Sequence, residues 1–280
     1  MEHQESQPTT AALEKLDHLR QSLGEMEGVL LAYSGGVDSA FLLHVAFDVL
    51  GERVLAVTAR SPLRPAAELA AAQQLASGLG AKHLVISTNE LDDPELVRNP
   101  QERCYLCKRR LFLGLKRLAA DEGLREVVDG SNSDDLGEHR PGLKALRELS
   151  VRSPLAESRL SKEEIRDLSR MLGLTTWDKP SQSCLATRFP YGEQLTSEKL
   201  RRVEEAERSL IKLGFRDLRV RSHGPLARIE VNPADMSALL QQAPVVVDKL
   251  EELGFVHITM DLKGYRTGSM DETQTSEANK

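Results

Sequence analysis

Residues 28–39, GVLLAYSGGVDS, join a short apolar run to a glycine-rich turn and the start of a helix. Residues 28–33 are apolar, as in a buried strand, and residues 37–50 carry apolar side chains at helical spacing. The turn at residues 34–39 therefore lies where a strand ends and a helix begins. Backbone N–H groups at a helix start lack partners within the helix, and the helix dipole is positive there. We expect this turn to bind an anion.

The side chains of the turn suit a phosphate group. Gly35 and Gly36 have no Cβ, so the backbone can wrap closely around phosphate oxygens, and the hydroxyls of Ser34 and Ser39 add donors. Asp38 stands in the first helical turn, where it can cap the helix or hold a water molecule bound to Mg²⁺. The turn has no lysine and does not follow the pattern G-x-x-x-x-G-K-[ST], so it is not the loop that holds a γ-phosphate for transfer. A capped helix after a tight turn is the structural alternative.

Strands and helices alternate through the first part of the chain. The sequence predicts strands at residues 28–33, 53–58, 82–87 and 125–129, and helices at 37–50, 66–79 and 108–120. A capping box of Ser161 and Glu164 opens a further predicted helix that extends to Leu172. This alternation predicts an α/β fold with a parallel sheet and helices on both faces. In that architecture, ligands bind beyond the carboxyl ends of the strands.

A segment with two prolines and a glycine, Asp178 to Gly192, is predicted to be an ordered loop between two domains. Beyond it the sequence predicts helices at residues 197–213, 233–242 and 245–253, and strands at 217–221, 227–231 and 256–262. This pattern indicates a smaller α+β domain. We place the first domain at residues 1–185, the second at 186–266 and a disordered polar tail at 267–280.

Composition excludes several classes of protein. With 280 residues, of which 40% are hydrophobic and 29% charged, the chain is long enough for two globular domains. Its longest apolar stretch, residues 40–50, is far shorter than the roughly 18 residues of a membrane span. The N-terminal residues lack the basic and apolar regions of an export signal, so we expect a cytoplasmic protein without a membrane partner. The net charge of −6 weighs against a nucleic-acid partner.

Three cysteines are the second chemical feature. Cys104 and Cys107 form a C-x-x-C pair just before a predicted helix, whose N-terminus favours thiolates that can face one metal centre. The third, Cys184, lies in the predicted interdomain loop. A tetrahedral zinc ion needs a fourth ligand, and none is evident by spacing, whereas three thiolates leave one iron of a 4Fe-4S cluster open. A redox pair, half of a zinc site and two packed thiols are the alternatives for the C-x-x-C pair.

These motifs carry two resemblances. Residues 34–39, SGGVDS, between a strand and a helix, resemble the PP-loop of the ATP pyrophosphatases, which release pyrophosphate after adenylating an acid or a carbonyl oxygen. Together with residues 102–108 (ERCYLCK), 140–155 (RPGLKALRELSVRSPL) and 179–192 (KPSQSCLATRFPYG), they are similar to the LarE family of ATP-dependent sulfur transferases. Members of that family make the nickel-pincer cofactor of lactate racemase. The similarity spans nearly the whole chain.

The resemblance implies that the protein binds ATP and Mg²⁺. The loop residues that would grip the pyrophosphate part of ATP are Ser34, Gly35, Gly36, Val37, Asp38 and Ser39, of which Asp38 is also a catalytic candidate. Thr58 and Gly130, at the ends of neighbouring strands, would lie near the nucleotide. The implied substrate is pyridinium-3,5-biscarboxylic acid mononucleotide, whose carboxylates are adenylated and then converted to thiocarboxylates. Adenylation neutralises one carboxylate oxygen and makes it a good leaving group.

The source of sulfur has two versions in this family. Some members have only the cysteine that matches Cys184 and give up its sulfur, leaving dehydroalanine. Others have three cysteines and bind a 4Fe-4S cluster that delivers sulfide. The present sequence has the three-cysteine pattern, so the resemblance implies a cluster held by Cys104, Cys107 and Cys184. A sacrificial Cys184 beside an incidental C-x-x-C pair is the alternative.

Two arginines of the second domain are candidates for substrate binding. Arg219 and Arg221 are two positions apart in a predicted strand and so share one face, and paired guanidinium groups suit a phosphate. A solvated charged face is the alternative. The LarE resemblance assigns them the phosphate of the mononucleotide, with Arg188 near Cys184 as a helper, in an active site between the domains. It also implies a homo-oligomer and, as further partners, other enzymes of the nickel-pincer pathway.

Three other functions share parts of this pattern. A tRNA thiolase also combines a PP-loop with cysteines, but the acidic net charge and the absence of a basic stripe weigh against it. An amidotransferase-like synthetase would use the loop and leave the three cysteines without a role. A nucleotide-binding regulator without turnover would bind ATP and release no pyrophosphate.

Overall fold

The computed structural model describes residues 8–137, 141–180, 183–266 and 269–270, and they form two compact units. Of these described residues, the first unit takes those within 8–61, 66–88 and 102–180, and the second takes those within 62–65, 89–101 and 183–270. The chain therefore enters the second unit twice before it stays there. Within that unit, the N–H of Leu185 donates to the carbonyl of Leu63 at 2.8 Å, and the N–H of Leu195 donates to the carbonyl of Val97 at 2.8 Å.

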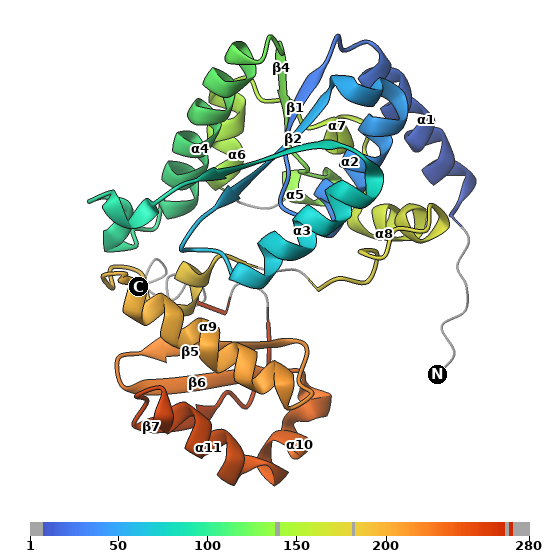
Figure 1. Cartoon of the computed structure of the whole chain (residues 1–280). Helices are drawn as coiled ribbons and strands as arrows, with labels where there is room; N and C mark the ends of the chain where they lie inside the picture. Colours follow the sequence, from blue (N-terminus) through green and yellow to red (C-terminus); the bar gives the residue numbers. More distant parts are fainter. Residues whose placement is uncertain (1–7, 138–140, 181–182, 267–268, 271–280) are drawn as a thin grey trace. The chain divides into compact units, whose positions relative to one another are not determined.

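The first unit has a four-stranded parallel sheet in the order β3-β2-β1-β4 (Figure 1). Its strands are β1 (Val29–Ala32), β2 (Val54–Arg60), β3 (Lys82–Ser87) and β4 (Glu126–Val128). All four lie within one or two residues of their predicted positions, and the predicted parallel α/β class is confirmed. Apolar runs produce these strands because a parallel sheet is covered on both faces.

Helices cover the two faces of this sheet. They are α1 (Thr10–Gly24), α2 (Val37–Leu50), α3 (Ala66–Leu79), α4 (Arg103–Asp121), α5 (Ser133–Leu136), α6 (Pro141–Glu148), α7 (Pro154–Glu157) and α8 (Lys162–Met171). Alternating side chains of β1 point to opposite faces: Val29 and Leu31 join the core formed with α1, α2 and α8, whereas Leu30 joins the core formed with α4 and α6. The carboxyl end of β1 is thereby fixed between two packed layers.

Two local predictions in this unit have different outcomes. The capping box is confirmed, because Ser161 Oγ accepts from the Glu164 N–H while Glu164 Oε2 accepts from the Ser161 N–H. The start of α4 was placed wrongly: the helix begins at Arg103, so Cys104 and Cys107 lie in its first two turns rather than before it. Pro100 stands three residues before this start, and the N-cap residue, Glu102, forms no side-chain capping hydrogen bond that would have marked it.

The second unit has a mixed three-stranded sheet in the order β5-β6-β7. Strand β5 (Leu218–His223) is antiparallel to β6 (Leu226–Val231), which is parallel to β7 (His257–Met260). The accompanying helices are α9 (Ser197–Lys212), α10 (Met236–Gln241) and α11 (Ala243–Glu252). Leu200, Val203 and Leu210 of α9 are buried in the core of this unit. The predicted α+β pattern therefore appears with small shifts in its boundaries.

The predicted tail falls mostly outside the described residues. Ser269 and Met270 are described, and Ser269 is packed rather than loose: its hydroxyl accepts from Arg221 at 3.0 Å and donates to Glu230 at 2.8 Å. Met270 Sδ lies 3.5 Å from a guanidinium nitrogen of Arg228. Among the described residues, no helix has the length and apolar character needed to cross a membrane.

Candidate active site

The glycine-rich turn leaves β1 and enters α2 in a conformation that requires its first glycine. Gly35 has a φ of +72°, and a Cβ at this position would lie 2.7 Å from the Cβ of Ala72. Gly36 is the N-cap of α2 with an extended backbone. The hydroxyls of Ser34 and Ser39 lie 3.0 Å apart, and Ser39 Oγ also accepts from the Ser34 N–H. The turn is thus folded upon itself and presents backbone at the start of a helix, as an anion site requires.

Two residues predicted at neighbouring strand ends have different surroundings. Gly130 follows β4, and a Cβ there would lie 3.0 Å from the backbone nitrogen of Ser39, so the chain passes directly against the turn. Thr58, in β2, is buried and donates its hydroxyl hydrogen to the carbonyl of Tyr33 at 2.7 Å. Its oxygen also lies 2.8 Å from Nε2 of His83. The structure brings Gly130 to the loop, whereas the Thr58 hydroxyl holds β1 to β2.

Asp38 is surrounded by two groups that the sequence analysis did not identify. Its Oδ2 accepts from the ammonium of Lys162 at 2.5 Å, and its Oδ1 accepts from the amide of Asn132 at 3.2 Å. Lys162 is the first residue of α8, and Asn132 caps α5 just after β4. A lysine at the positive end of a helix is electrostatically unfavourable. The position of Lys162 directly after the predicted N-cap, Ser161, is therefore a signal in the sequence that could have indicated a functional role for this lysine.

A second lysine reaches the same turn. The ammonium of Lys179 donates to the carbonyl of Gly35 at 2.8 Å. The glycine-rich turn contains no lysine, so the two ammonium groups come from residues more than a hundred positions further along the chain. Their convergence gives the turn the positive charge that its own sequence lacks.

The C-x-x-C pair lies on a helix that is tied to the same edge of the sheet. Cys104 is exposed and Cys107 is half-buried. One residue further on, Lys108 places its ammonium 3.6 Å from the carboxylate of Asp129, the residue between β4 and Gly130. Asp129 is buried and also accepts hydrogen bonds from the hydroxyls of two serines, Ser131 and Ser153, each at 2.6 Å. This connection orients the start of α4 with respect to the glycine-rich turn.

Cys184 stands in the second unit at the start of a short 3₁₀ helix, Leu185–Arg188, and is half-buried. Its carbonyl accepts from the N–H and the hydroxyl of Thr187, at 2.9 and 2.8 Å, and from Arg188 at 3.2 Å. The turn that carries the cysteine therefore has a fixed backbone.

Arg188 is a buried structural anchor of that turn. Its guanidinium forms a two-pronged ion pair with the carboxylate of Glu207, with both N–O distances at 2.8 Å. The remaining terminal nitrogen donates to oxygens of Ser183, Cys184 and Thr187. A substrate phosphate would have to displace these acceptors, so the arrangement supports a positioning role for Arg188 more directly than the predicted substrate contact.

Arg219 and Arg221 lie on one face of β5 and are both buried. Arg221 pairs with Glu230, with Nη2 to Oε2 at 2.8 Å, and also donates to the carbonyl of Thr187 at 3.0 Å. Arg219 stacks over the ring of Tyr265, with its guanidinium carbon 4.8 Å from the ring centroid. Burial and the nearby positive charge of Arg188 lower the pKa of Arg219. An anion beside Arg219 would relieve that repulsion.

Neither unit by itself brings together all the side chains that the predicted metal sites need, as far as the described residues show. In the part of the chain that the structure describes, no group of three or more His, Cys, Asp or Glu side chains is placed to hold a metal ion. Cys104 and Cys107 are one helical turn apart, which suits two thiolate ligands of one centre. Mg²⁺ that arrives with nucleotide phosphates needs only one or two carboxylates, and Asp38 offers one beside the turn. The iron–sulfur and magnesium assignments remain predictions.

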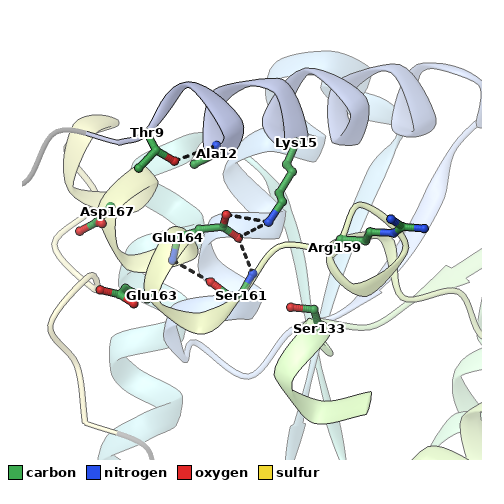
Figure 2. Close-up of a pocket in the computed structure, with 9 residues that line it drawn as sticks. All are labelled: Thr9, Ala12, Lys15, Ser133, Arg159, Ser161, Glu163, Glu164 and Asp167. Atoms are coloured by element: carbon green, nitrogen blue, oxygen red, sulfur yellow. Dashed lines mark hydrogen bonds and ion pairs between the residues drawn. The ribbon is translucent and has the colours of Figure 1, made fainter. Parts of the chain in front are cut away.

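A pocket of about 360 Å³ lies elsewhere in the first unit, between the N-terminal ends of α1 and α8 (Figure 2). Its lining residues are Thr9, Ala12, Lys15, Ser133, Arg159, Ser161, Glu163, Glu164 and Asp167. Within it, the ammonium of Lys15 lies 2.6 Å from the carboxylate of Glu164. Dashed lines in Figure 2 mark this ion pair. None of the lining residues belongs to the glycine-rich turn, so this pocket is not the predicted nucleotide site.

Comparison with known proteins identifies this arrangement. No protein-family model matches the chain. A GMP synthase of Chlamydia muridarum is 30% identical over 173 residues, which are 56% of this chain and 33% of that enzyme. This similarity, the parallel sheet and the glycine-rich turn define the first unit as a PP-loop ATP pyrophosphatase.

Other relatives match nearly the whole chain, among them the following two proteins. The pyridinium-3,5-bisthiocarboxylic acid mononucleotide synthase of Lactiplantibacillus plantarum is 38% identical over 255 residues, 91% of this chain and 92% of that protein. The chain therefore belongs to the LarE family and is an ATP-dependent, adenylating sulfur transferase. An uncharacterized protein of Synechocystis sp. is 46% identical over 263 residues, 93% of this chain and 98% of that protein.

Proposed function

We propose that this protein adenylates the carboxylates of pyridinium-3,5-biscarboxylic acid mononucleotide and converts them to thiocarboxylates for the nickel-pincer cofactor of lactate racemase. The 38% identity to the Lactiplantibacillus plantarum synthase, which extends through both units, carries this proposal. The expected partners are this small mononucleotide and, as a homo-oligomer, further copies of the chain.

The residues around the turn support the adenylation step. A carboxylate oxygen of the substrate attacks the α-phosphorus of ATP, and the bond from that phosphorus to the α,β-bridging oxygen breaks, so that oxygen leaves with pyrophosphate. The N–H groups at the start of α2 and the ammonium of Lys162 stabilise the charge on the departing group. Asp38 would hold Mg²⁺, which would supply additional positive charge for the phosphates. Asn132 and Lys162 hold the Asp38 carboxylate in place.

Sulfur then replaces AMP at the activated carbon. Cys104, Cys107 and Cys184 would hold a 4Fe-4S cluster, which, with three thiolate ligands, would supply an open iron site for sulfide. In the alternative version, the Cys184 thiolate attacks the acyl-adenylate and AMP leaves with the bonding electrons. Removal of the Cys184 α-proton then breaks its Cβ–S bond, giving a thiocarboxylate and dehydroalanine. Arg188 and Arg221 fix the backbone that presents Cys184.

Substrate recognition is assigned to the basic side chains of the second unit. Arg188, Arg219 and Arg221 face two buried carboxylates, Glu207 and Glu230, in this cluster. A phosphate monoester is the kind of anion that paired guanidinium groups bind, and burial, followed by the nearby charge of Arg188, lowers the pKa of Arg219.

A single turnover distinguishes the two sulfur sources. The protein is purified and reconstituted without oxygen, mixed with Mg-ATP and the dicarboxylate mononucleotide, and both protein and product are weighed by mass spectrometry. Formation of thiocarboxylate without a mass change at Cys184 supports the cluster. A loss of about 34 Da at Cys184, the mass of H₂S, supports sacrifice. A Cys104→Ser variant that keeps iron, sulfide and full turnover would contradict the cluster, and absence of any thiocarboxylate would contradict the proposed function.

A further inference from the structure

We propose that Lys179 is a second cation of the PP-loop, which binds the pyrophosphate part of ATP, and that Arg166 is the residue that positions it. This inference goes beyond the family assignment and rests on ATP cleavage at the loop, a part of the proposed function that is tested separately below. It identifies one further binding residue and one positioning residue in the first unit.

The surroundings of the Lys179 ammonium indicate an anionic ligand. The side chain is half-buried, and its Nζ lies 2.8 Å from the carbonyl oxygen of Gly35, in the middle of the glycine-rich turn. In the residues that the structure describes, no carboxylate pairs with Lys179, whereas Lys162 is paired with Asp38 at 2.5 Å. A half-buried ammonium that has one carbonyl as its acceptor still has two N–H groups and a full charge to place. Phosphate oxygens at the turn would satisfy both.

The segment that carries Lys179 is held from the same helix that supplies Lys162. Arg166, one turn along α8 from Lys162, donates to the carbonyl of Trp177 at 2.7 Å and to the carbonyl of Lys179 at 3.0 Å. Arg170, a further turn along, stacks its guanidinium 4.1 Å from the centroid of the Trp177 ring. Residues four apart lie on one side of a helix, so a single rigid element places both ammonium groups at the turn.

Charge at this position matters most when pyrophosphate leaves. As the bond between the α-phosphorus and the bridging oxygen breaks, negative charge accumulates on the β-phosphate. A fixed ammonium stabilises that charge more than it stabilises bound ATP, because it is already oriented by the protein. Loss of Lys179 is therefore expected to reduce kcat for pyrophosphate release as well as affinity for pyrophosphate.

Three substitutions separate charge from tethering. Lys179→Gln keeps a donor for the Gly35 carbonyl and removes the charge, Lys179→Met removes both, and Lys179→Arg keeps the charge. The matched control is Lys116→Gln, because Lys116 also donates to a backbone carbonyl, that of Leu149 at 2.7 Å, outside the turn. Each purified full-length protein is titrated calorimetrically with inorganic pyrophosphate and with a non-hydrolysable ATP analogue, and pyrophosphate release is measured with substrate.

We expect Lys179→Gln and Lys179→Met to weaken pyrophosphate binding to the same extent, by about tenfold to a hundredfold, as for loss of a charge-assisted hydrogen bond. Lys179→Arg is expected to keep most of the affinity, and Lys116→Gln to match the wild type. Wild-type affinity in Lys179→Gln would overturn the proposal, and so would a defect in Lys179→Met that Gln restores, because that result would make Lys179 a tether. Failure of the wild type to bind either ligand would instead contradict ATP use at this loop.

Arg166 is tested through its dependence on Lys179. Arg166→Ala should weaken pyrophosphate binding in the wild-type background and have little further effect in the Lys179→Gln background, because residues that act through one another are not additive. Arg166→Lys should not restore binding, because a single ammonium group cannot reproduce the two hydrogen bonds that the planar guanidinium donates to the carbonyls of Trp177 and Lys179. Additive losses in the double variant would show that Arg166 does not act through Lys179.

Discussion

Substitution of Gly35 by alanine tests whether the conformation of the glycine-rich turn is as constrained as the structure shows. Gly35 adopts a φ of +72°, which costs an L-residue about 1–2 kcal/mol. The new Cβ would lie 2.7 Å from the Cβ of Ala72, and relief of such a clash costs about 1–3 kcal/mol. Gly35→Ala should therefore reduce the free energy of unfolding of the first unit by about 2–5 kcal/mol.

The protein has one tryptophan, Trp177, and it lies in the first unit, so its fluorescence reports the unfolding of that unit in urea. With an m-value of about 2 kcal/mol/M, the expected shift of the midpoint is roughly 1–2.5 M toward lower urea. Gly36→Ala is the matched control: Gly36 has a φ of −79°, and a Cβ there would meet nothing closer than Ser34 Oγ at 3.4 Å. We expect it to cost less than about 1 kcal/mol.

A double variant identifies the cause of the loss. Ala72→Gly removes the nearest atom that the new Cβ would meet, at 2.7 Å, and leaves the Ala72 Cα at 3.0 Å. Compared with the Ala72→Gly single variant, which has its own helix cost of about 0.5–1 kcal/mol, the double variant should recover part of the packing defect of Gly35→Ala and leave the backbone part. If Gly35→Ala and Gly36→Ala unfold at the same urea concentration, the reasoning from φ and from the close approach to Ala72 is wrong.

Three further predictions follow from individual contacts. Asp38→Ala should weaken binding of an ATP analogue in calorimetric titration, because Lys162 then has no carboxylate to orient it; equal affinity would remove Asp38 from the site. Glu207→Gln should lower the free energy of unfolding by about 3–5 kcal/mol in chemical denaturation followed by circular dichroism, since it leaves the buried Arg188 charge unpaired; replacing both residues by apolar ones should cost less. Burial lowers the pKa of His83, so the unfolded chain binds a proton that the folded chain does not, and stability should fall as the pH drops below about 6.5. His83→Gln should flatten that dependence, and an unchanged slope would contradict it.

The strands and the phosphate loop were predictable because local patterns determine them. Residues 28–33 are continuously apolar, and a serine and two glycines follow, so period and turn chemistry agree. The capping box at Ser161 and Glu164 was equally local and is confirmed. The helix α4 was predicted to begin too late because its N-cap, Glu102, forms no side-chain capping hydrogen bond and Pro100, three residues before the start, was not used as a boundary signal.

The residues that complete the site could not be found by local reasoning. Lys162 and Lys179 reach the loop through tertiary packing of α8 and the segment after it. No local sequence pattern around either lysine predicts a contact with the loop. Sequence alternation placed Arg219 and Arg221 on one face, but their pairing with buried carboxylates depends on the register of β5 against β6. The two arginines therefore lie in a buried network that includes the ion pair of Arg221 with Glu230, and this network also stabilises the second unit.

The most direct test of the central claim is the fate of a substrate carboxylate oxygen. The dicarboxylate mononucleotide is labelled with heavy oxygen in its carboxylates and incubated with Mg-ATP and the full-length protein under anaerobic conditions, and the nucleotide products are analysed by mass spectrometry. Adenylation at the PP-loop predicts pyrophosphate together with AMP that carries one labelled oxygen, in step with thiocarboxylate formation. ADP and phosphate as products, or AMP without the label, would contradict the account.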